Sequence, residues 1–378
     1  MTRAQSTDYR TWITRLPYAW ASGQAFLFWI EDKPMTLKII NKEDVLPFVA
    51  SAMKEYEVMA PVANDTAFKF DTLVDSSQLR LDYNTTIIPP RKVLLPQKET
   101  LFTFRTDIPP AAPAFDMQWR VIFGVHTCDL HAMGMLDAVF AKGNPDAHYM
   151  KRRATTTIVS IECLDACDEH SFCKSMNTLS ASSGFDLHLI DLGDIYAVDV
   201  GTTAGEVLLT NHAKSHNASR PELGLLDKTM SAKWARFPSR LALDGKDLPT
   251  LMGISYKRPI WDEIGARCFG CGACNIVCPT CYCFDVKDEI SLDGKTGERY
   301  RVWDSCQLDE FARIGSGENF RKTHAQRLRH RFMRKGKYIA EAYPGHTGCV
   351  GCGRCARACL VDITPIGVWN SLHKAHAM

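Results

Sequence analysis

Two runs of cysteines carry the clearest chemistry in this chain of 378 residues. In each run four cysteines are separated by two, two and three residues. The first run holds Cys268, Cys271, Cys274 and Cys278, and the second run holds Cys349, Cys352, Cys355 and Cys359. Three thiolates two residues apart can ligate three corners of one four-iron cluster, and the fourth, after a longer step, is turned away. The spacing therefore predicts iron–sulfur clusters.

The same spacing is the ligand run of bacterial two-cluster ferredoxins, in which the fourth cysteine of each run ligates the other run's cluster. Pro279, directly after the first run, fits that pattern. Two copies predict two [4Fe-4S] clusters. The expected sets are Cys268, Cys271, Cys274 and Cys359 for cluster 1, and Cys349, Cys352, Cys355 and Cys278 for cluster 2. A pair of zinc knuckles is the alternative. Each knuckle would need only the four cysteines of its own run, and the proline after the first run would have no role.

A four-cysteine site is predicted upstream of both runs. Its members are Cys128, Cys163, Cys167 and Cys173. Cys128 and Cys163 come just after apolar stretches that predict strands, Arg120–Val125 and Thr155–Ile161, and α/β folds build sites where such strands end. Four convergent cysteines predict a third [4Fe-4S] cluster. The alternative is a set of free thiols buried as small hydrophobic side chains.

Three cysteines remain outside these sets: Cys281, Cys283 and Cys306. The first two follow the first run so closely that a structural role, or one beside the ligands, is favoured over ligation. A catalytic thiol or a sulfur-handling cluster is the alternative for this group.

Composition indicates an ordinary globular protein, with 46% hydrophobic and 23% charged residues and a formal net charge of +2. A balanced charge implies no acidic or basic partner for the chain as a whole. The sequence has no apolar run near the roughly 18 residues that span a bilayer and no signal-peptide pattern, so no membrane span is expected. With 15 cysteines and no secretory signal, the chain is predicted to be cytoplasmic, where thiols stay reduced.

The predicted fold class is α+β, with an N-terminal α/β domain followed by a ferredoxin-like two-cluster domain. Residues 1–34 are an aromatic-rich extension, residues 35–250 form the α/β domain with the four-cysteine site, and residues 251–378 form the two-cluster domain. A 70-residue insertion, 279–348, separates the two runs. Within it, Ser291–Trp303 predicts a hairpin turning at Asp293-Gly294.

The insertion also predicts a strongly basic helix within Asn319–Ala342. A solvated face or a subunit contact is favoured over nucleic acid, because no aromatic side chains are interleaved with the charges. Arginine and lysine near thiolate-ligated clusters would raise their reduction potentials. No G-x-G-x-x-G follows a strand and no P-loop is present, so no flavin or nicotinamide is expected on this chain.

Several stretches together resemble a known family. They are Cys278-Pro-Thr-Cys-Tyr-Cys-Phe-Asp-Val286, Arg301-Val-Trp-Asp-Ser-Cys306, Arg327-Leu-Arg-His-Arg331 and the second run. They are similar to the β subunit of cytoplasmic sulfhydrogenases, which are soluble NiFe hydrogenases, and to the A subunit of anaerobic sulfite reductase. Members of that family often carry cysteine where this chain has Ser171, a difference that bears on the third cluster.

The resemblance implies an iron–sulfur electron-transfer subunit that is not catalytic alone. It would relay electrons between an FAD/NAD(P)-binding subunit and a catalytic subunit, either a NiFe hydrogenase or a siroheme sulfite reductase. Two alternatives stay open. One is a sulfur-reactive enzyme, of the polysulfide or disulfide reductase kind, that uses the extra cysteines, and the other is a free ferredoxin-like carrier.

Overall fold

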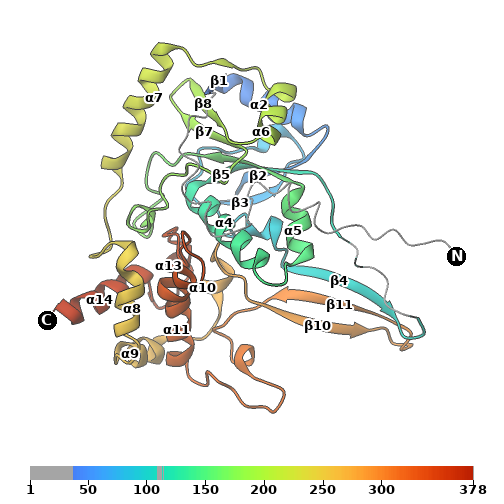
Figure 1. The fold of residues 1–378 in the computed structure, drawn as a ribbon, viewed down its shortest axis with the longest axis vertical. Helices are drawn as coiled ribbons and strands as arrows, with labels where there is room; N and C mark the ends of the chain where they lie inside the picture. The colour runs from blue at the N-terminus through green and yellow to red at the C-terminus, as the bar shows by residue number, and fades with distance from the viewer. Residues whose placement is uncertain (1–36, 109–112, 114, 378) are drawn as a thin grey trace.

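The computed structural model describes residues 37–108, 113 and 115–377. The predicted extension, residues 1–34, lies outside the described residues. The described part is mixed α+β, with a twisted sheet in its N-terminal half and helices with short cysteine loops in its C-terminal half (Figure 1). This agrees with the predicted fold class. Among the described helices, none has the length and apolar character that crossing a membrane requires.

The central sheet has eight strands in the order β3-β2-β5-β6-β7-β8-β1-β9. Strands β2, β5, β6 and β7 run parallel, and the pairs toward both edges are antiparallel. The strands are β1 Lys38–Asn41, β2 Glu57–Asn64, β3 Ala67–Thr72, β5 Arg120–His126, β6 Thr156–Ile161, β7 Leu187–Asp191, β8 Ile195–Val200 and β9 His216–Asn217. The strands predicted in this region are confirmed.

Helices cover both faces of this sheet. Val121 and Phe123 of β5 pack into one core with helices α2 and α6, whereas Ile122 and Val125 pack into another with α4 and α5. Successive side chains point to opposite faces from Val121 to Phe123. An irregularity in the register between Phe123 and Val125 then brings Val125 to the face of Ile122. The helices are α2 Lys42–Ala52, α3 Arg91–Leu94, α4 Thr127–Ala141, α5 Ala147–Ala154, α6 Thr203–His212 and α7 Arg220–Lys233.

Helix α7 begins earlier than the sequence predicts. A helix is expected around Asp227–Phe237, but it starts at Arg220, after a capping box in which Ser219 and Glu222 bond each other's backbone, and ends at Lys233. The serine followed three residues later by glutamate, with Pro221 near the first position, was the signal available in the sequence.

A three-stranded arm joins the two halves of the chain. The predicted hairpin turn at Asp293-Gly294 is confirmed, but the hairpin is longer than expected, because its first strand, β10 Phe284–Ile290, lies before Ser291. The second strand is β11 Thr296–Trp303, and β4 Lys98–Arg105 pairs with β11 along its length. The arm extends away from the body of the molecule (Figure 1). Because β4 comes from the N-terminal half, the insertion of the two-cluster domain is built into one sheet with residues of the α/β domain.

The C-terminal half is helical and has its own core around Trp261, Phe332 and Trp369. Phe172 and Met176, from the loop that follows β6, pack into the same core. The helices are α8 Leu248–Ile254, α9 Ile260–Arg267, α10 Ala273–Ile276, α11 His324–Met333, α12 Ile339–Ala342, α13 Arg354–Arg357 and α14 Pro365–Ala377. A π-helical turn, Arg334–Tyr338, links α11 to α12.

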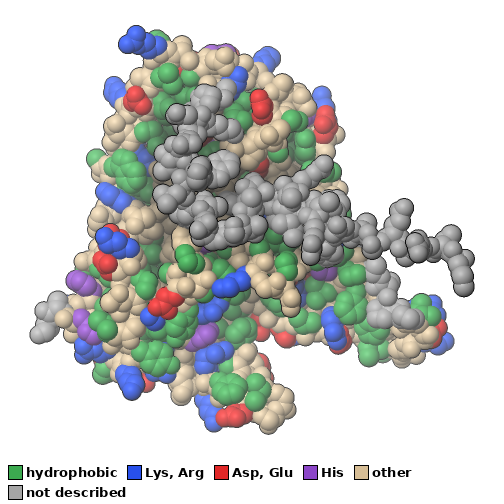
Figure 2. All heavy atoms as spheres, in the orientation of Figure 1, with side chains coloured by type: hydrophobic (Ala, Val, Ile, Leu, Met, Phe, Trp, Pro, Cys, Tyr) green, Lys and Arg blue, Asp and Glu red, His purple; other side chains and the backbone are tan. Residues whose placement is uncertain are grey.

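The predicted basic helix is confirmed, but not all of its basic side chains face solvent. Arg327 and Arg331 of α11 are 5% and 4% exposed, so they point inward. On the face drawn in Figure 2, the described Lys and Arg side chains are interspersed with Asp and Glu. Part of the positive charge of this helix is therefore internal, and the sequence pattern did not reveal which arginines turn inward.

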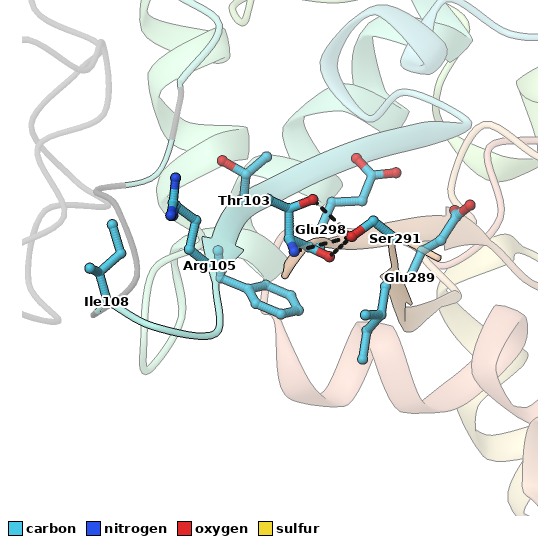
Figure 3. Close-up of a pocket in the computed structure, with 10 residues that line it drawn as sticks. Thr103, Arg105, Ile108, Glu289, Ser291 and Glu298 are labelled. Atoms are coloured by element: carbon cyan, nitrogen blue, oxygen red, sulfur yellow. Dashed lines mark hydrogen bonds between the residues drawn. The ribbon is translucent and has the colours of Figure 1, made fainter. Parts of the chain in front are cut away.

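An open hollow of about 520 Å³ lies at the tip of the three-stranded arm. Figure 3 shows Thr103 and Arg105 of β4 beside Glu289, Ser291 and Glu298 of the hairpin. No cysteine lines this hollow. The hollow therefore shares no cysteine with the candidate iron–sulfur sites described next.

Candidate iron–sulfur centres

The two cysteine runs adopt the same local backbone. In each, two glycines with positive φ precede a single helical turn, α10 in the first run and α13 in the second. The φ values are +66° at Gly270 and +78° at Gly272, against +69° at Gly351 and +75° at Gly353. Glycine adopts such angles without steric cost, which allows the chain to wrap tightly around a cluster. The repeated spacing thus corresponds to a repeated conformation.

A small cavity of about 20 Å³ lies between the runs. Its cysteines are Cys278, Cys349, Cys352 and Cys355, which is the set predicted for cluster 2. Three thiols therefore come from the second run and one from the first. Apolar side chains, including Phe172, Phe332 and Trp369, complete the wall. Four thiols around a largely apolar cavity suit a thiolate-ligated cluster, whose potential depends on such exclusion of water.

The set predicted for cluster 1 lies nearer the surface. Cys271 is exposed, and the pKa of Cys268 is raised by burial, with Cys271 and Cys359 among the neighbours that act on it. Backbone amides donate to two of the sulfurs, from Gly270 to Cys268 at 3.4 Å and from Ile363 to Cys359 at 3.2 Å. The last cysteine of the second run is thus beside the first cysteine of the first run.

The four-cysteine site is gathered at the carboxyl ends of β5 and β6. Cys128 is the second residue of α4, and Cys163 comes two residues after the end of β6. Burial raises the pKa of Cys163 most, and Cys167 and Cys173 raise it further, so these thiols are close neighbours. Ser171 is buried and donates its hydroxyl to the Asp168 carbonyl at 2.9 Å. The Ser171 side chain therefore stabilises the turn after Asp168. Cys167 and Cys173, on either side of it in the sequence, supply the sulfurs.

This four-cysteine site touches the second run. The amide of Phe172 donates to the Gly351 carbonyl at 2.7 Å, and Thr178 Oγ1 donates to the Val350 carbonyl at 2.6 Å. A Cβ on Gly351 would lie 2.6 Å from the Cys173 nitrogen. Cys352 acts on the pKa of Cys128. Cys352 therefore links the cluster 2 cavity to the upstream site.

A buried ion pair fixes this contact. Arg354 donates to both carboxylate oxygens of Asp129, at 2.6 and 2.7 Å, and the two residues are 2% and 1% exposed. Arg354 also donates to the Thr86 carbonyl at 2.8 Å. Two parallel hydrogen bonds from one guanidinium give geometric precision as well as attraction. The residue after Cys128 thus anchors the residue before Cys355.

Cations are placed around the runs by α11 and the π-helical turn. Arg331 and Lys335 both line the cluster 2 cavity. Arg331 Nη2 also donates to the Cys274 carbonyl at 3.4 Å, so it lies between the runs. Lys335 Nζ donates to Thr280 Oγ1 at 2.7 Å. The arginine-rich sequence predicted cations near clusters, but which residues turn inward depends on the packing of α11.

Burial controls the thiol acidities at these sites. It raises the pKa of Cys352 to about 12, and those of Cys167 and Cys173 to about 11. Iron binds the thiolate, so loading the sites must displace these protons. Within the described ranges, no three His, Cys, Asp or Glu side chains converge closely enough to hold a single metal ion.

The three remaining cysteines also lie together. The Cys283 sulfur lies within hydrogen-bond reach of both Cys281 and Cys306. Sequence reasoning left this group unassigned, because Cys306 is separated from the other two by the β10–β11 hairpin. Arg91, from the α/β domain, lies close to the same group. Nothing in its sequence context marked Arg91.

The paired loops and the four-thiol cavity define an iron–sulfur protein of the two-cluster ferredoxin class, and residues 267–363 match the family model of the 4Fe-4S dicluster domain. The chain is 32% identical over 334 residues to sulfhydrogenase 2 subunit beta of Pyrococcus furiosus, which covers 88% of this chain and 97% of that protein. The chain therefore belongs to the sulfhydrogenase β subunit family and is an iron–sulfur electron-transfer subunit. No solved structure matches it.

Proposed function

We propose that this chain relays single electrons between an FAD/NAD(P)-binding reductase subunit and a catalytic subunit, either a NiFe hydrogenase or a siroheme sulfite reductase. The name of the Pyrococcus relative, a sulfhydrogenase subunit, supports a place in a multi-subunit complex. Reducing, cytoplasmic conditions suit the many free thiols. The chain positions the clusters and sets their surroundings, and one-electron exchange is the chemistry that the clusters supply when bound.

The ligand sets in this proposal are those expected from the spacing. Cluster 1 takes the first three cysteines of the first run with Cys359, and cluster 2 takes the first three of the second run with Cys278. The four-cysteine site takes the third [4Fe-4S] cluster. The observation that carries the proposal is the cavity in which Cys278 meets Cys349, Cys352 and Cys355.

The order of the sites supports a relay. Cys352 is next to the four-cysteine site, and Arg331 lies between the cavity and Cys274 of the first run. The far end of this series is open, because Phe269 and Leu360, which follow Cys268 and Cys359, are 65% and 84% exposed. We infer that electrons enter through the buried end and leave to a partner at cluster 1, or the reverse.

The test is anaerobic reconstitution of the full chain followed by iron and sulfide analysis and electron paramagnetic resonance. Three clusters predict about twelve irons per chain, and a firm value of eight would remove the third cluster. Cys359→Ser should weaken the signal of cluster 1, whereas Cys278→Ser should weaken that of cluster 2. The opposite assignment would refute crossed ligation, and isolation as a monomer without a flavoprotein would argue against the relay.

A further inference from the structure

The three-thiol group, Cys281, Cys283 and Cys306, is not used by the proposed clusters. Cys283 is the middle member, because its sulfur lies within hydrogen-bond reach of both other sulfurs and its single S–H can donate to either. Cys281 and Cys306 are each 5% exposed. Three thiols in hydrogen-bond contact inside a protein are close enough for a small side-chain rotation to bring two sulfurs into bonding geometry.

The sulfur of Cys306 is arranged as an acceptor. Asn275 Nδ2 donates to it at 3.0 Å, and Gln307 Nε2 donates at 3.7 Å. The Cys283 thiol contributes a third hydrogen bond. Donors converging on one sulfur stabilise negative charge there. This is the environment of a nucleophilic thiolate and not that of a thiol buried for packing.

Buried cations face the same group without carboxylate partners. Arg91 is 2% exposed, and its Nε and Nη1 have no hydrogen-bond partner. Its guanidinium stacks on Trp303 at 3.6 Å, and Cys281 is the charged neighbour that acts on it most. Among the described residues, neither Arg91 nor Lys335 pairs with a carboxylate. A buried cation needs a counter-charge nearby, and the sulfurs are the groups available to supply it.

The group is also connected to both runs. Asn275, which binds Cys306, directly follows Cys274. The amide of Cys281 donates to the Cys278 carbonyl at 3.2 Å. Thr280 Oγ1 lies 3.3 Å from the Cys278 sulfur and accepts from Lys335. One buried cation is therefore shared between the three-thiol group and the cluster 2 cavity.

We propose that Cys281, Cys283 and Cys306 form a two-electron thiol–disulfide centre that exchanges electrons with the neighbouring clusters. Cys283 bonds to Cys306 on oxidation. The inference rests on the proposed function, because oxidised [4Fe-4S] clusters are the electron acceptors. Such a centre would accept or donate two electrons together for a reaction at a partner, and would exchange them one at a time with the clusters of the relay.

The step balances within the group. The S–H bond of Cys283 breaks, an S–S bond forms between Cys283 and Cys306, and two electrons leave, one to each of two clusters. Cys281 and Cys306 react as thiolates, so the proton of Cys283 passes to the sulfur of Cys281, to which it is hydrogen-bonded, and no proton leaves the group. The reverse step takes two electrons and returns the proton, so the third thiol stores the proton and makes the centre reversible.

The experiment is a redox titration of the anaerobically reconstituted full chain, with acid quenching, alkylation and peptide mass spectrometry at each potential. Poised reduced, all three thiols should be alkylated. Poised with the clusters oxidised, the Cys283 and Cys306 peptides should be cross-linked and two hydrogens lighter. Reductive titration should take two more electrons per chain than in Cys283→Ser. Cys281→Ser removes the proton acceptor, so its cross-link should form with a midpoint potential that depends on pH, whereas the wild-type midpoint should not.

Two results would overturn the proposal. One is alkylation of all three thiols at every potential that oxidises the clusters. The other is loss of iron from Cys283→Ser while the signals of clusters 1 and 2 persist, because the thiols would then be iron ligands. Failure of the relay proposal is a distinct result: the paramagnetic signals of clusters 1 and 2 would be missing from the wild-type chain, whatever the thiols do.

Discussion

The two cysteine runs share spacing and backbone conformation but lie in opposite surroundings. Phe269, second in the first run, is 65% exposed, whereas Val350 at the same place in the second run is 2% exposed. Cys271 is exposed, and its counterpart Cys352 lines the enclosed cavity. The cysteine spacing is therefore the same in both runs, while their exposure differs. The residues between the ligands and the domain that covers them decide whether a cluster faces a partner or the protein interior.

Covering the second run requires residues that the first run lacks. Ala273 in the first run corresponds to Arg354 in the second, and only Arg354 reaches a carboxylate, Asp129. The α/β domain thus holds one half of the ferredoxin-like unit and leaves the other half open. The comparison makes predictions in which the same change, placed in each run, has unequal effects.

The largest effect is expected from Arg354→Met. It leaves Asp129 as an unpaired buried charge, which typically costs about 3–5 kcal/mol. Chemical unfolding of the anaerobic chain should show a lower midpoint, and the signal of cluster 2 should be lost before that of cluster 1. Arg267→Met, which removes an exposed arginine beside the first run, should cost no more than about 1 kcal/mol.

The double variant Arg354→Met with Asp129→Leu tests the cause. Removing both charges should recover much of the lost stability, because no buried charge is left without a partner. If the double variant is as unstable as the single one, packing and not charge explains the effect.

Alanine at matched glycines gives the next effect. Gly351 and Gly270 share a positive φ, but a Cβ on Gly351 would lie 2.6 Å from the Cys173 backbone, whereas one on Gly270 meets the His324 side chain at 2.9 Å. Backbone cannot give way as a side chain can. Gly351→Ala should cost about 2–4 kcal/mol and Gly270→Ala about 1–2 kcal/mol.

Iron analysis of the two glycine variants shows where the strain acts. Gly351→Ala should lose iron from the four-cysteine site, because Cys173 must move, while Gly270→Ala should keep it. Equal iron loss in both variants would contradict the contact between the four-cysteine site and the second run.

Arg331→Met should shift the potentials of both clusters downward. Arg331 lies near Cys274 of one run and Cys355 of the other, and a nearby positive charge stabilises the reduced state. At an effective dielectric constant near 20, the loss is on the order of 50–100 mV. Potentiometric titration would measure both shifts. Lys335→Met should shift cluster 2 alone, and Arg329→Met, stacked on Tyr256 instead, should shift neither.

How much of this could be predicted from sequence depends on distance along the chain. The strands of the α/β sheet and the hairpin at Gly294 follow from local patterns, namely apolar runs and a turn residue. The ligand sets remain predictions from spacing, and the cavity lined by Cys278 with three cysteines of the second run supports them. The strands, the hairpin turn and the ligand spacing each depend on a few residues that lie close together in the sequence.

Contacts between distant segments were not predictable in the same way. The pairing of β4 with β11 joins residues about 200 positions apart. The sequence of neither strand indicates which strand it will pair with. Arg91 next to Cys281 and Asp129 next to Arg354 are single residues whose partners depend on the whole fold. The sequence shows that these side chains are charged, but it does not show which residues they contact in the fold.

The smallest effect distinguishes the two surroundings most directly. Val350→Ala should cost about 1–2 kcal/mol, because it opens a small cavity between the second run and the four-cysteine site. Phe269→Ala should change stability by less than about 0.5 kcal/mol, since the ring is mostly in solvent. Phe269→Ala should instead slow electron transfer to the partner complex while iron content stays constant. A stability loss at Phe269 equal to that at Val350 would mean that both runs are covered, and cluster 1 would then not be the exit.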